Sequence, residues 1–222
     1  TAYDATATDG QRGTGATLFI ENDANSNLSY SQIALQARTG YEYCRIVATG
    51  GAAPDLAFVV NNAERMRIDS AGRVTMPYQP AFSAKMVTGQ SNMPSGYNTI
   101  TFDSEVYDVG GDYNTSTYAF MAPVTGKYLL TANVSVNSLP VDAQWFFMRI
   151  DTSNRAYSNT TSLDQFDATS DSSHGTSFEV SIVADMDIGD TAQVKTYQYT
   201  GTTSVDIVTS PSYTFFTGYL LG

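Results

Sequence analysis

The segment PSYTFFTGYLLG, residues 211–222, places four aromatic side chains and two leucines within twelve residues. Burial of one Phe or Leu side chain is worth about 1.5–3 kcal/mol, so such a segment is not expected to lie in open water. Alternation of aromatic and hydroxyl residues is typical of a β-strand, whose successive side chains point to opposite faces. The sequence therefore predicts a strand here that packs against other protein surface.

The chain from residue 80 to this segment reads as a series of short strands. Nine or ten candidate strands are separated by turn residues at roughly the 8–12-residue spacing of a sandwich or barrel. Two of them alternate over long stretches, KYLLTANVSV at residues 127–136 and TSFEVSIVADM at residues 176–186. The predicted buried faces are Tyr128, Leu130, Ala132, Val134 and Val136 on the first and Phe178, Val180, Ile182 and Ala184 on the second. The period is 2 and not 3.6, which predicts an all-β fold.

Composition divides the chain into three parts. Residues 1–15 are small and polar and are predicted to form a flexible arm or linker. Residues 16–79 carry four or five short predicted strands, and the segment MPYQPAF, residues 76–82, marks the boundary to a larger domain at residues 80–222. A domain as small as the first has a thin core and is marginal alone, which favours three copies wrapped together.

The small domain leaves local choices open. The segment LSYSQIALQAR, residues 28–38, changes its alternation at Gln32 and fits either a strand with a bulge or a short helix. The segments LAFVVNN and ERMRIDSAGRVTM, residues 56–62 and 64–76, predict a hairpin that turns at residues 70–72.

The charge and composition of the chain exclude several classes of partner. Only 15% of the 222 residues are charged, and the formal net charge is −11. Nucleic acids and anionic lipid surfaces need clustered Lys and Arg, so neither is an expected partner. No apolar run approaches the ~18 residues of a membrane-spanning helix, so no membrane insertion is expected. Cys44 is the only cysteine, which excludes a disulfide within one chain.

Four motifs of the larger domain occur in the order and spacing of a known family. They are Phe102-Asp103, YNTSTYAFMAPVTGKYLL at residues 113–130, IGDTAQVK at residues 188–195 and YTFFTGYLLG at residues 213–222. Together they resemble the globular head of the first complement component, a jelly-roll family related to the tumour necrosis factors. The sequence departs from that family at Tyr118, where a Gly is usual.

This resemblance implies a fold, an assembly and a set of core residues. It implies a ten-stranded jelly-roll sandwich of two sheets over residues 80–222, built as a tight homotrimer. It also implies that the segment 213–222 is a central strand of the inner sheet, with one face in the subunit core and one near the neighbouring subunit. The residues assigned to the core and the trimer contact are Phe120, Tyr128, Phe216, Tyr219 and Leu221.

A second resemblance concerns the small domain. AERMRIDSAGRVTM, residues 63–76, is similar to a phrase that recurs in tail-fibre and other fibre proteins of bacteriophages. GTGATLFIENDANSNLSYSQIALQA, residues 13–37, has the same character. In such proteins the phrase usually comes just before a distal head or a chaperone domain. The resemblance therefore implies a small β-rich trimerising domain in front of a distal knob.

The sequence offers little catalytic chemistry. His174 is the only histidine, and Ser173 and Asp171 supply the other residue types of a hydrolytic triad. Residues adjacent in sequence rarely meet in triad geometry, so we expect no enzyme activity and no cofactor.

Calcium is the one ion that the sequence brings into consideration, because it needs several oxygen ligands close together. The candidate ligands are Asp164, Asp167 and Asp171, with Asp185, Asp187 and Asp190 as a second cluster. Solvated acidic loops are the preferred interpretation of both clusters.

Two polar segments are the candidates for recognition of a ligand. RAYSNTTSLDQFDATSDSSHG, residues 155–175, and YQYTGTTS, residues 197–204, are predicted to be exposed loops. Aromatic rings beside Asn and Asp supply the flat apolar faces and fixed hydrogen-bonding groups that sugar binding uses. The predicted receptor-binding residues are Tyr157, Asn159, Phe166, Tyr197 and Tyr199.

These features predict a viral structural protein, a homotrimeric bacteriophage fibre or spike on the virion surface, without catalysis. Its N-terminal part would contact other virion proteins, and its jelly-roll knob would bind a glycan or protein of the host surface. Three alternatives are open: a trimeric capsid decoration or head-fibre protein, a secreted complement-head-like lectin or ligand of a cell, and a polysaccharide-cleaving spike.

Overall fold

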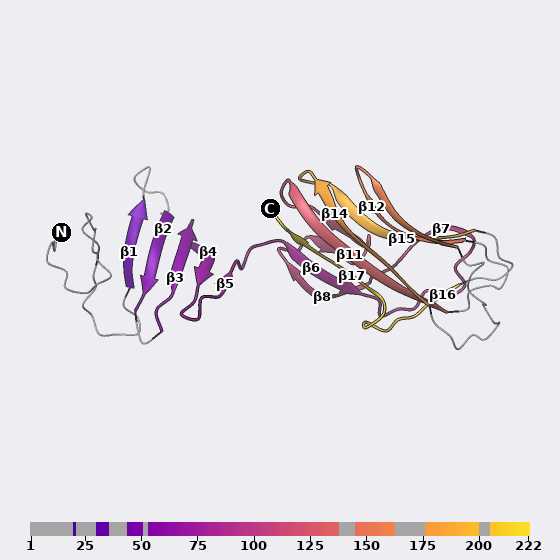
Figure 1. Cartoon of the computed structure of the whole chain (residues 1–222), viewed down its shortest axis with the longest axis horizontal. Coiled ribbons are helices and arrows are strands. Elements are labelled where there is room, and N and C mark those ends of the chain that lie inside the picture. The colour runs from indigo at the N-terminus through magenta and orange to yellow at the C-terminus, as the bar shows by residue number, and fades with distance from the viewer. Residues whose placement is uncertain are drawn as a thin grey trace. The chain divides into compact units, whose positions relative to one another are not determined.

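The protein is described from a computed structural model, which defines residues 20, 30–35, 44–50, 53–137, 145–162, 176–199 and 205–222. The chain divides into two compact units, Thr1–Tyr78 and Gln79–Gly222, within the proline-containing segment 76–82. The regular structure among the described residues is all β (Figure 1). None of these residues belongs to a helix that is long and apolar enough to cross a membrane.

The described residues form seventeen strands. In the first unit they are β1 (Tyr30–Leu35), β2 (Cys44–Thr49), β3 (Leu56–Val60), β4 (Ala63–Ile68) and β5 (Val74–Thr75). In the second unit they are β6 (Ala81–Lys85), β7 (Gly96–Thr99), β8 (Ser104–Val109), β9 (Tyr113–Asn114), β10 (Ala119–Met121), β11 (Gly126–Asn137), β12 (Trp145–Thr152), β13 (Ala156–Ser162), β14 (Thr176–Met186), β15 (Thr191–Tyr199), β16 (Asp206–Ile207) and β17 (Phe215–Leu220).

The first unit is one antiparallel sheet in the order β1-β2-β3-β4-β5. Residues 30–35 form a strand, which decides between the two structures that the sequence allowed there. The hairpin predicted to turn at residues 70–72 is present between β4 and β5, and β3 and β4 form a second hairpin that the sequence did not predict. Strands β3 and β4 turn at Asn61 and Asn62, which both have a φ of 55°, and β4 and β5 turn at residues 69–73. Consecutive positive φ values favour Asn, so this pair is a turn signal that the sequence reading missed.

One face of this first sheet is apolar. Strand pairing places Ile33, Ile46, Phe58 and Met66 in one row across β1–β4, and Leu56, Ile68 and Val74 in the next row. On the opposite face Arg67 forms ion pairs with Asp55 and Glu64. Among the described residues of the apolar face, Ile33 is 42% exposed and Ile46 and Leu56 are each 37% exposed.

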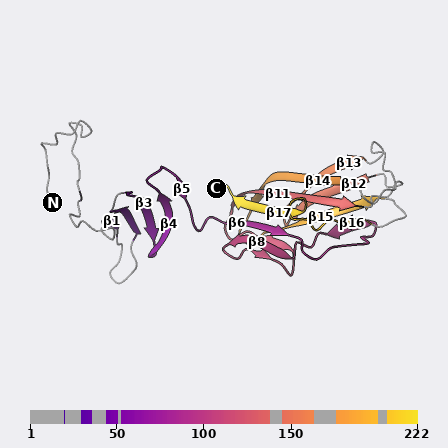
Figure 2. The same ribbon diagram turned by 90° about the horizontal axis from the view of Figure 1, so that it is seen from below.

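The second unit is a sandwich of two antiparallel sheets (Figures 1 and 2). The inner sheet has the order β14-β11-β17-β6-β8, and the outer sheet has the order β13-β12-β15-β10-β9. These ten strands confirm the predicted ten-stranded jelly roll, and the short strands β7 and β16 pair with β15 and β11. The alternation predicted for β11 is confirmed, since its inward residues from Tyr128 to Val136 are all fully buried.

An aromatic cluster fills the space between the two sheets. The Phe82 ring of the inner sheet stacks on Phe120 of the outer sheet, with 4.6 Å between ring centroids. The Phe216 ring meets the Phe82 ring edge-on, with 4.9 Å between ring centroids. The Tyr113 ring stacks on the Phe82 ring, with 5.2 Å between centroids. All four side chains are buried. Offset and edge-on ring pairs of this kind add about 0.5–1.5 kcal/mol each beyond the burial of their area.

Strand β17 lies in the middle of the inner sheet, between β11 and β6, as the resemblance implies. Its inward residues are Phe216 and Gly218, and a Cβ at position 218 would force neighbouring side chains to shift. A Cβ there would lie 2.6 Å from Leu130 Cδ2 and 2.8 Å from Phe82 Cε1. The Gly of the closing motif is therefore needed so that the aromatic cluster can approach the strand backbone.

Two other motifs of the resemblance, Phe102-Asp103 and residues 188–195, each contain an Asp whose carboxylate accepts backbone hydrogen bonds next to a strand. Asp103 accepts hydrogen bonds from the backbone N–H groups of Val87 at 2.7 Å and Thr88 at 2.9 Å. Burial opposes ionisation of Asp103, but these bonds and the Thr88 side chain outweigh it, so its pKa is lowered. Asp190 accepts from the backbone N–H of Asp187 at 2.8 Å and closes the turn before β15.

The departure at Tyr118 falls on a backbone position that suits glycine. Tyr118 has a φ of +57° in the turn between β9 and β10. A non-Gly residue in this region is strained by roughly 1–2 kcal/mol. The fold is kept in spite of the substitution, and the turn carries the strain.

We expect Tyr118→Gly to be more stable than Tyr118→Ala by about 1 kcal/mol, because both remove the ring and only Gly relieves the strained φ. Urea unfolding of the two variants at one protein concentration measures the difference. An alanine variant as stable as the glycine variant would contradict the backbone explanation.

We expect Gly218→Ala to lower the free energy of unfolding by about 1–3 kcal/mol, because the added methyl overpacks the aromatic cluster. Gly222→Ala is the matched control, since a Cβ at Gly222 meets no atom within 4 Å. Thermal unfolding of both variants is the measurement, and equal melting temperatures would contradict the packing argument.

Candidate functional site

Four aromatic rings lie together on the outward face of the outer sheet. Strand pairing sets Tyr97 of β7, Tyr197 of β15 and Phe147 of β12 side by side in one row that continues to Thr160 of β13. Trp145 precedes Phe147 by two residues on β12 and so points to the same face. We call Tyr97, Tyr197, Phe147 and Trp145 the aromatic row. With Thr160 they line an open hollow of about 470 Å³.

The rings of the aromatic row touch one another but keep part of their surface open. Ring centroids of Tyr97 and Tyr197 are 4.6 Å apart, those of Phe147 and Tyr197 are 5.5 Å apart, and those of Trp145 and Phe147 are 6.5 Å apart. Tyr97 is 59% exposed and Trp145 is 39% exposed. The hydrogen bonds of the described residues do not use the phenol oxygens of Tyr97 and Tyr197 or the indole nitrogen of Trp145.

Three charged side chains adjoin the aromatic row and neutralise one another in part. Asp151 forms ion pairs with Arg149 Nε at 2.6 Å and with Lys195 Nζ at 2.9 Å. The guanidinium carbon of Arg149 lies 4.0 Å from the centroid of the Tyr97 ring. Asp151 therefore holds Arg149 against the row, and a cation over a ring face is a favourable contact.

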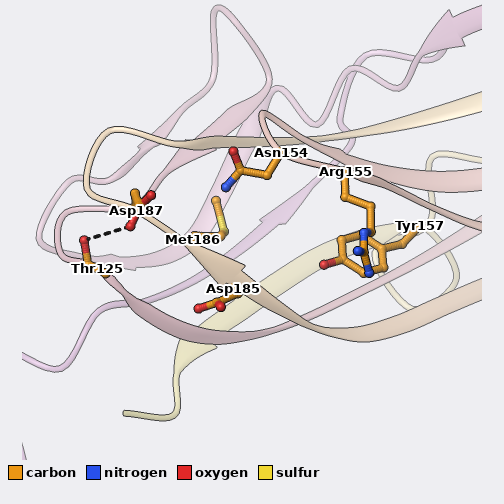
Figure 3. Close-up of a pocket in the computed structure, with 7 residues that line it drawn as sticks. All are labelled: Thr125, Asn154, Arg155, Tyr157, Asp185, Met186 and Asp187. Atoms are coloured by element: carbon orange, nitrogen blue, oxygen red, sulfur yellow. Dashed lines mark hydrogen bonds between the residues drawn. The ribbon is translucent and has the colours of Figure 1, made fainter.

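A second, charged pocket of about 580 Å³ lies at the opposite end of the β12–β13 hairpin (Figure 3). Figure 3 shows Arg155 against the Tyr157 ring, and the distance from the guanidinium carbon to the ring centroid is 5.8 Å. Asp187 faces Thr125, whose hydroxyl donates to it at 3.4 Å. The other lining residues are Asn154, Asp185 and Met186.

The acids around this pocket already serve the fold. Asp190 accepts hydrogen bonds from Asn154 Nδ2 at 2.6 Å and from the backbone of Asp187. Asp185 pairs with Lys127 at 3.5 Å. The part of the chain that the structure describes contains no group of three His, Cys, Asp or Glu residues that is arranged to hold a metal ion. In this arrangement Asp185, Asp187 and Asp190 do not form such a group.

The structure separates the predicted receptor-binding residues. The expectation of loops is wrong for Tyr157 and Asn159, which lie in strand β13, and for Tyr197 and Tyr199, which lie in β15. Tyr157 packs against the core, and Asn159 Nδ2 donates to the backbone oxygen of Glu179 at 2.9 Å. Tyr197 lies on the outward face, in the aromatic row. The predicted set thus combined residues of the inward face, such as Tyr157, with Tyr197 of the outward face.

Several predicted site residues lie outside the described residues. These are the calcium candidates Asp164, Asp167 and Asp171, the receptor-binding candidate Phe166, and the triad candidates Ser173 and His174.

The sequence reading missed Tyr97, Trp145 and Phe147. A signal existed in WFFMRI, residues 145–150, because a strand puts Trp145 and Phe147 on one face and Phe146 on the other. Phe146 is indeed buried, so the other two must face outward. Their meeting with Tyr97 and Tyr197 depends on the order of strands in the sheet, which local alternation does not contain.

Comparison with known proteins assigns the second unit to a family. The family model described as C1q domain matches residues 81–221. No curated protein sequence matches the chain. Among solved structures, the globular domain of the zebrafish complement 1qA protein is 17% identical, with a TM-score of 0.47 over 65% of this chain and 98% of that one. Murine APRIL at pH 8.5 is 16% identical, with a TM-score of 0.47 over 64% of this chain and 99% of that one.

We expect Asp151→Asn to destabilise the protein by about 1–3 kcal/mol, because it leaves Arg149 and Lys195 unpaired while their side chains are only 22% and 28% exposed. Asp185→Asn removes an ion pair whose side chains are 62% and 80% exposed, and should cost less than about 0.5 kcal/mol. Melting temperatures measure both changes. Equal losses in the two variants would show that Asp151 does not organise this face.

Proposed function

The chain belongs to the C1q domain family, and we propose that its second unit is the trimeric binding head of a fibre. Domains of this family, like the related tumour-necrosis-factor-like jelly rolls, typically form homotrimers and act as binding modules and not as enzymes. The observation that carries the proposal is an apolar row on the outward face of the inner sheet. This row supplies the surface that a trimer would bury.

The apolar row runs across all five strands of the inner sheet. Pairing aligns its members from β14 to β8, and these are Val183, Leu129, Tyr219, Ala81 and Val109. Tyr219 is 46% exposed and Val183 is 50% exposed within one chain. Exposed apolar side chains that form a continuous row favour an interface.

A row of hydroxyl side chains lies directly beside the apolar row. Pairing aligns Ser181, Thr131, Thr217, Ser83 and Tyr107 across the same five strands. Thr131 and Ser181 share a hydrogen bond of 2.7 Å, and Thr217 donates to the backbone oxygen of Phe82 at 2.7 Å. Hydroxyls satisfied within the chain add no desolvation penalty to a contact between subunits.

Strand β17 serves both surfaces in this proposal. Phe216 is buried in the aromatic cluster, while Tyr219 and Leu221 are about half exposed. The assignment of Phe120, Tyr128 and Phe216 to the core agrees with their complete burial within one chain. Tyr219 and Leu221 are the members of the predicted set that have surface left for a neighbouring subunit.

The first unit supports the same stoichiometry. Its described strands form one sheet, and Ile33, Ile46 and Leu56 of the apolar face keep 37–42% of their surface exposed. A single sheet needs a second apolar surface for independent stability. Three copies of this unit facing one axis would cover the three apolar faces together.

We propose further that the trimer is a bacteriophage fibre or spike on the virion, with the head binding a glycan or protein of the host surface. The fibre-like segment 63–76, the absence of more than one cysteine in the chain and the outward aromatic row support this function. Three copies of one weak site raise avidity by about 10²–10⁴. A capsid decoration protein and a secreted lectin-like ligand are the alternatives, and antibody labelling of virions with an anti-head serum separates them.

We expect Tyr219→Asp to convert the trimer to folded monomers, because a carboxylate would be buried in the centre of the apolar row. Met121→Asp is the matched control, since Met121 is an exposed apolar residue of the outer sheet. Light scattering gives the mass, and far-UV circular dichroism shows whether each variant is folded. A trimer that tolerates Tyr219→Asp would place the subunit contact elsewhere.

A further inference from the structure

We propose that the aromatic row binds an uncharged glycan chain by stacking of its sugar rings on Tyr97, Tyr197, Phe147 and Trp145. This inference rests on the proposed function, because it names the class of ligand that the proposed binding head takes. In that proposal the subunits of the trimer contact one another through the inner sheet. The aromatic row lies on the outward face of the outer sheet, whereas the apolar row around Tyr219 lies on the outward face of the inner sheet. The glycan site therefore stays open when the subunits assemble.

The chemistry of the row favours a ligand that is apolar on its faces and polar at its edges. Three of its four rings carry a polar tip, namely the phenol groups of Tyr97 and Tyr197 and the indole N–H of Trp145. These groups make no hydrogen bond to other described residues. An apolar protein partner would bury them without partners, which costs about 1–3 kcal/mol per group. A pyranose ring covers an aromatic face with its C–H groups and offers hydroxyls to the tips.

The overall charge of the chain favours a neutral ligand, whereas Arg149, Lys195 and Asp151 beside the row sum to a single positive charge. Arg149 and Lys195 are both paired with Asp151, and Arg149 lies over one face of Tyr97. The chain as a whole carries a net charge of −11, which repels an acidic polymer at a distance. An extended neutral polysaccharide is not repelled by this net charge. The rings of the aromatic row offer it successive stacking positions along the sheet.

The aromatic row has a polar border on its described side. The next outward row of the same sheet is Thr99, Lys195, Arg149 and Ser158, which is polar and charged throughout. Among the described residues, the aromatic row is therefore bordered on this side by polar and charged side chains, and at β13 by Thr160. An aromatic surface beside fixed polar groups is the form that a ligand site takes.

Trp145 makes the inference directly measurable, because it is the only tryptophan of the chain. The full chain is titrated with the neutral hexasaccharides cellohexaose, maltohexaose and chitohexaose, and with acidic hexagalacturonate, while the Trp145 emission is recorded. We expect at least one neutral hexasaccharide to change the emission with saturation below about 10 mM, the range of a Kd near 1 mM. Hexagalacturonate should bind more weakly than that neutral probe.

Two variants locate the binding. Tyr97→Ala should weaken the affinity about tenfold or more, because it removes a stacking face worth roughly 1.4 kcal/mol. Tyr78→Ala is the matched control: Tyr78 and Tyr97 are both 59% exposed, and each has an arginine over its ring, with Arg65 at 4.3 Å from Tyr78. The control should bind as the wild type does.

Three results would overturn the inference. One is an emission that no neutral probe changes, the second is an affinity unchanged in Tyr97→Ala, and the third is a preference for hexagalacturonate. Light scattering on the same samples keeps the proposals apart. A trimer without an emission response refutes the glycan site alone, while a monomer that binds the neutral probe refutes the trimer and leaves the glycan site standing.

Discussion

The position of strand β17 is the constraint on which the rest of this structure depends. It lies between β11 and β6 in the middle of the inner sheet, so each of these neighbours is hydrogen-bonded to it along one edge. Its period of two gives it an inward face with Phe216 and Gly218 and an outward face with Tyr219. The inward face completes the aromatic cluster between the sheets, and the outward face is the centre of the proposed subunit contact. One strand thus couples the core of the subunit to its assembly.

The two outward faces of the sandwich differ in chemistry in a way that fits two different tasks. The inner sheet presents an apolar row beside hydroxyls, three of which are already hydrogen-bonded within the chain. Such a surface gains by exclusion of water against a copy of itself. The outer sheet presents rings whose polar tips make no hydrogen bond to other described residues, beside paired charges. Such a surface suits a hydrated ligand, and its threefold repetition would multiply a weak affinity.

Much of the fold was predictable because the long strands have clear patterns. The alternation of β11 assigned its buried face correctly, and four short motifs led to the ten-stranded jelly roll. Strand β13 was taken for a loop because Ser, Thr and Asn fill residues 158–162. It is nevertheless a strand, since it pairs with β12 over seven residues, and Thr suits an exposed edge strand.

The candidate site was predicted far less well than the fold. Sequence composition selected Tyr157 and Tyr197 together, but the strands place one against the core and the other on the outward face. The partners of Tyr197 are Tyr97 and Phe147, which are distant from it along the chain. Their contact follows from sheet order and register, which are properties of the whole domain and not of any segment. The turn at Tyr118 is a local feature instead. The sequence showed it directly, because Tyr118 stands where the family usually has a Gly.

The mass of the wild-type protein in solution tests the central claim most directly. Sedimentation velocity at low micromolar concentration should give three times the 24.0 kDa of one chain, because the apolar row and the open face of the first sheet are then buried. A well-folded particle with the mass of a single chain, stable on dilution, would contradict the account of strand β17 as the link between core and assembly.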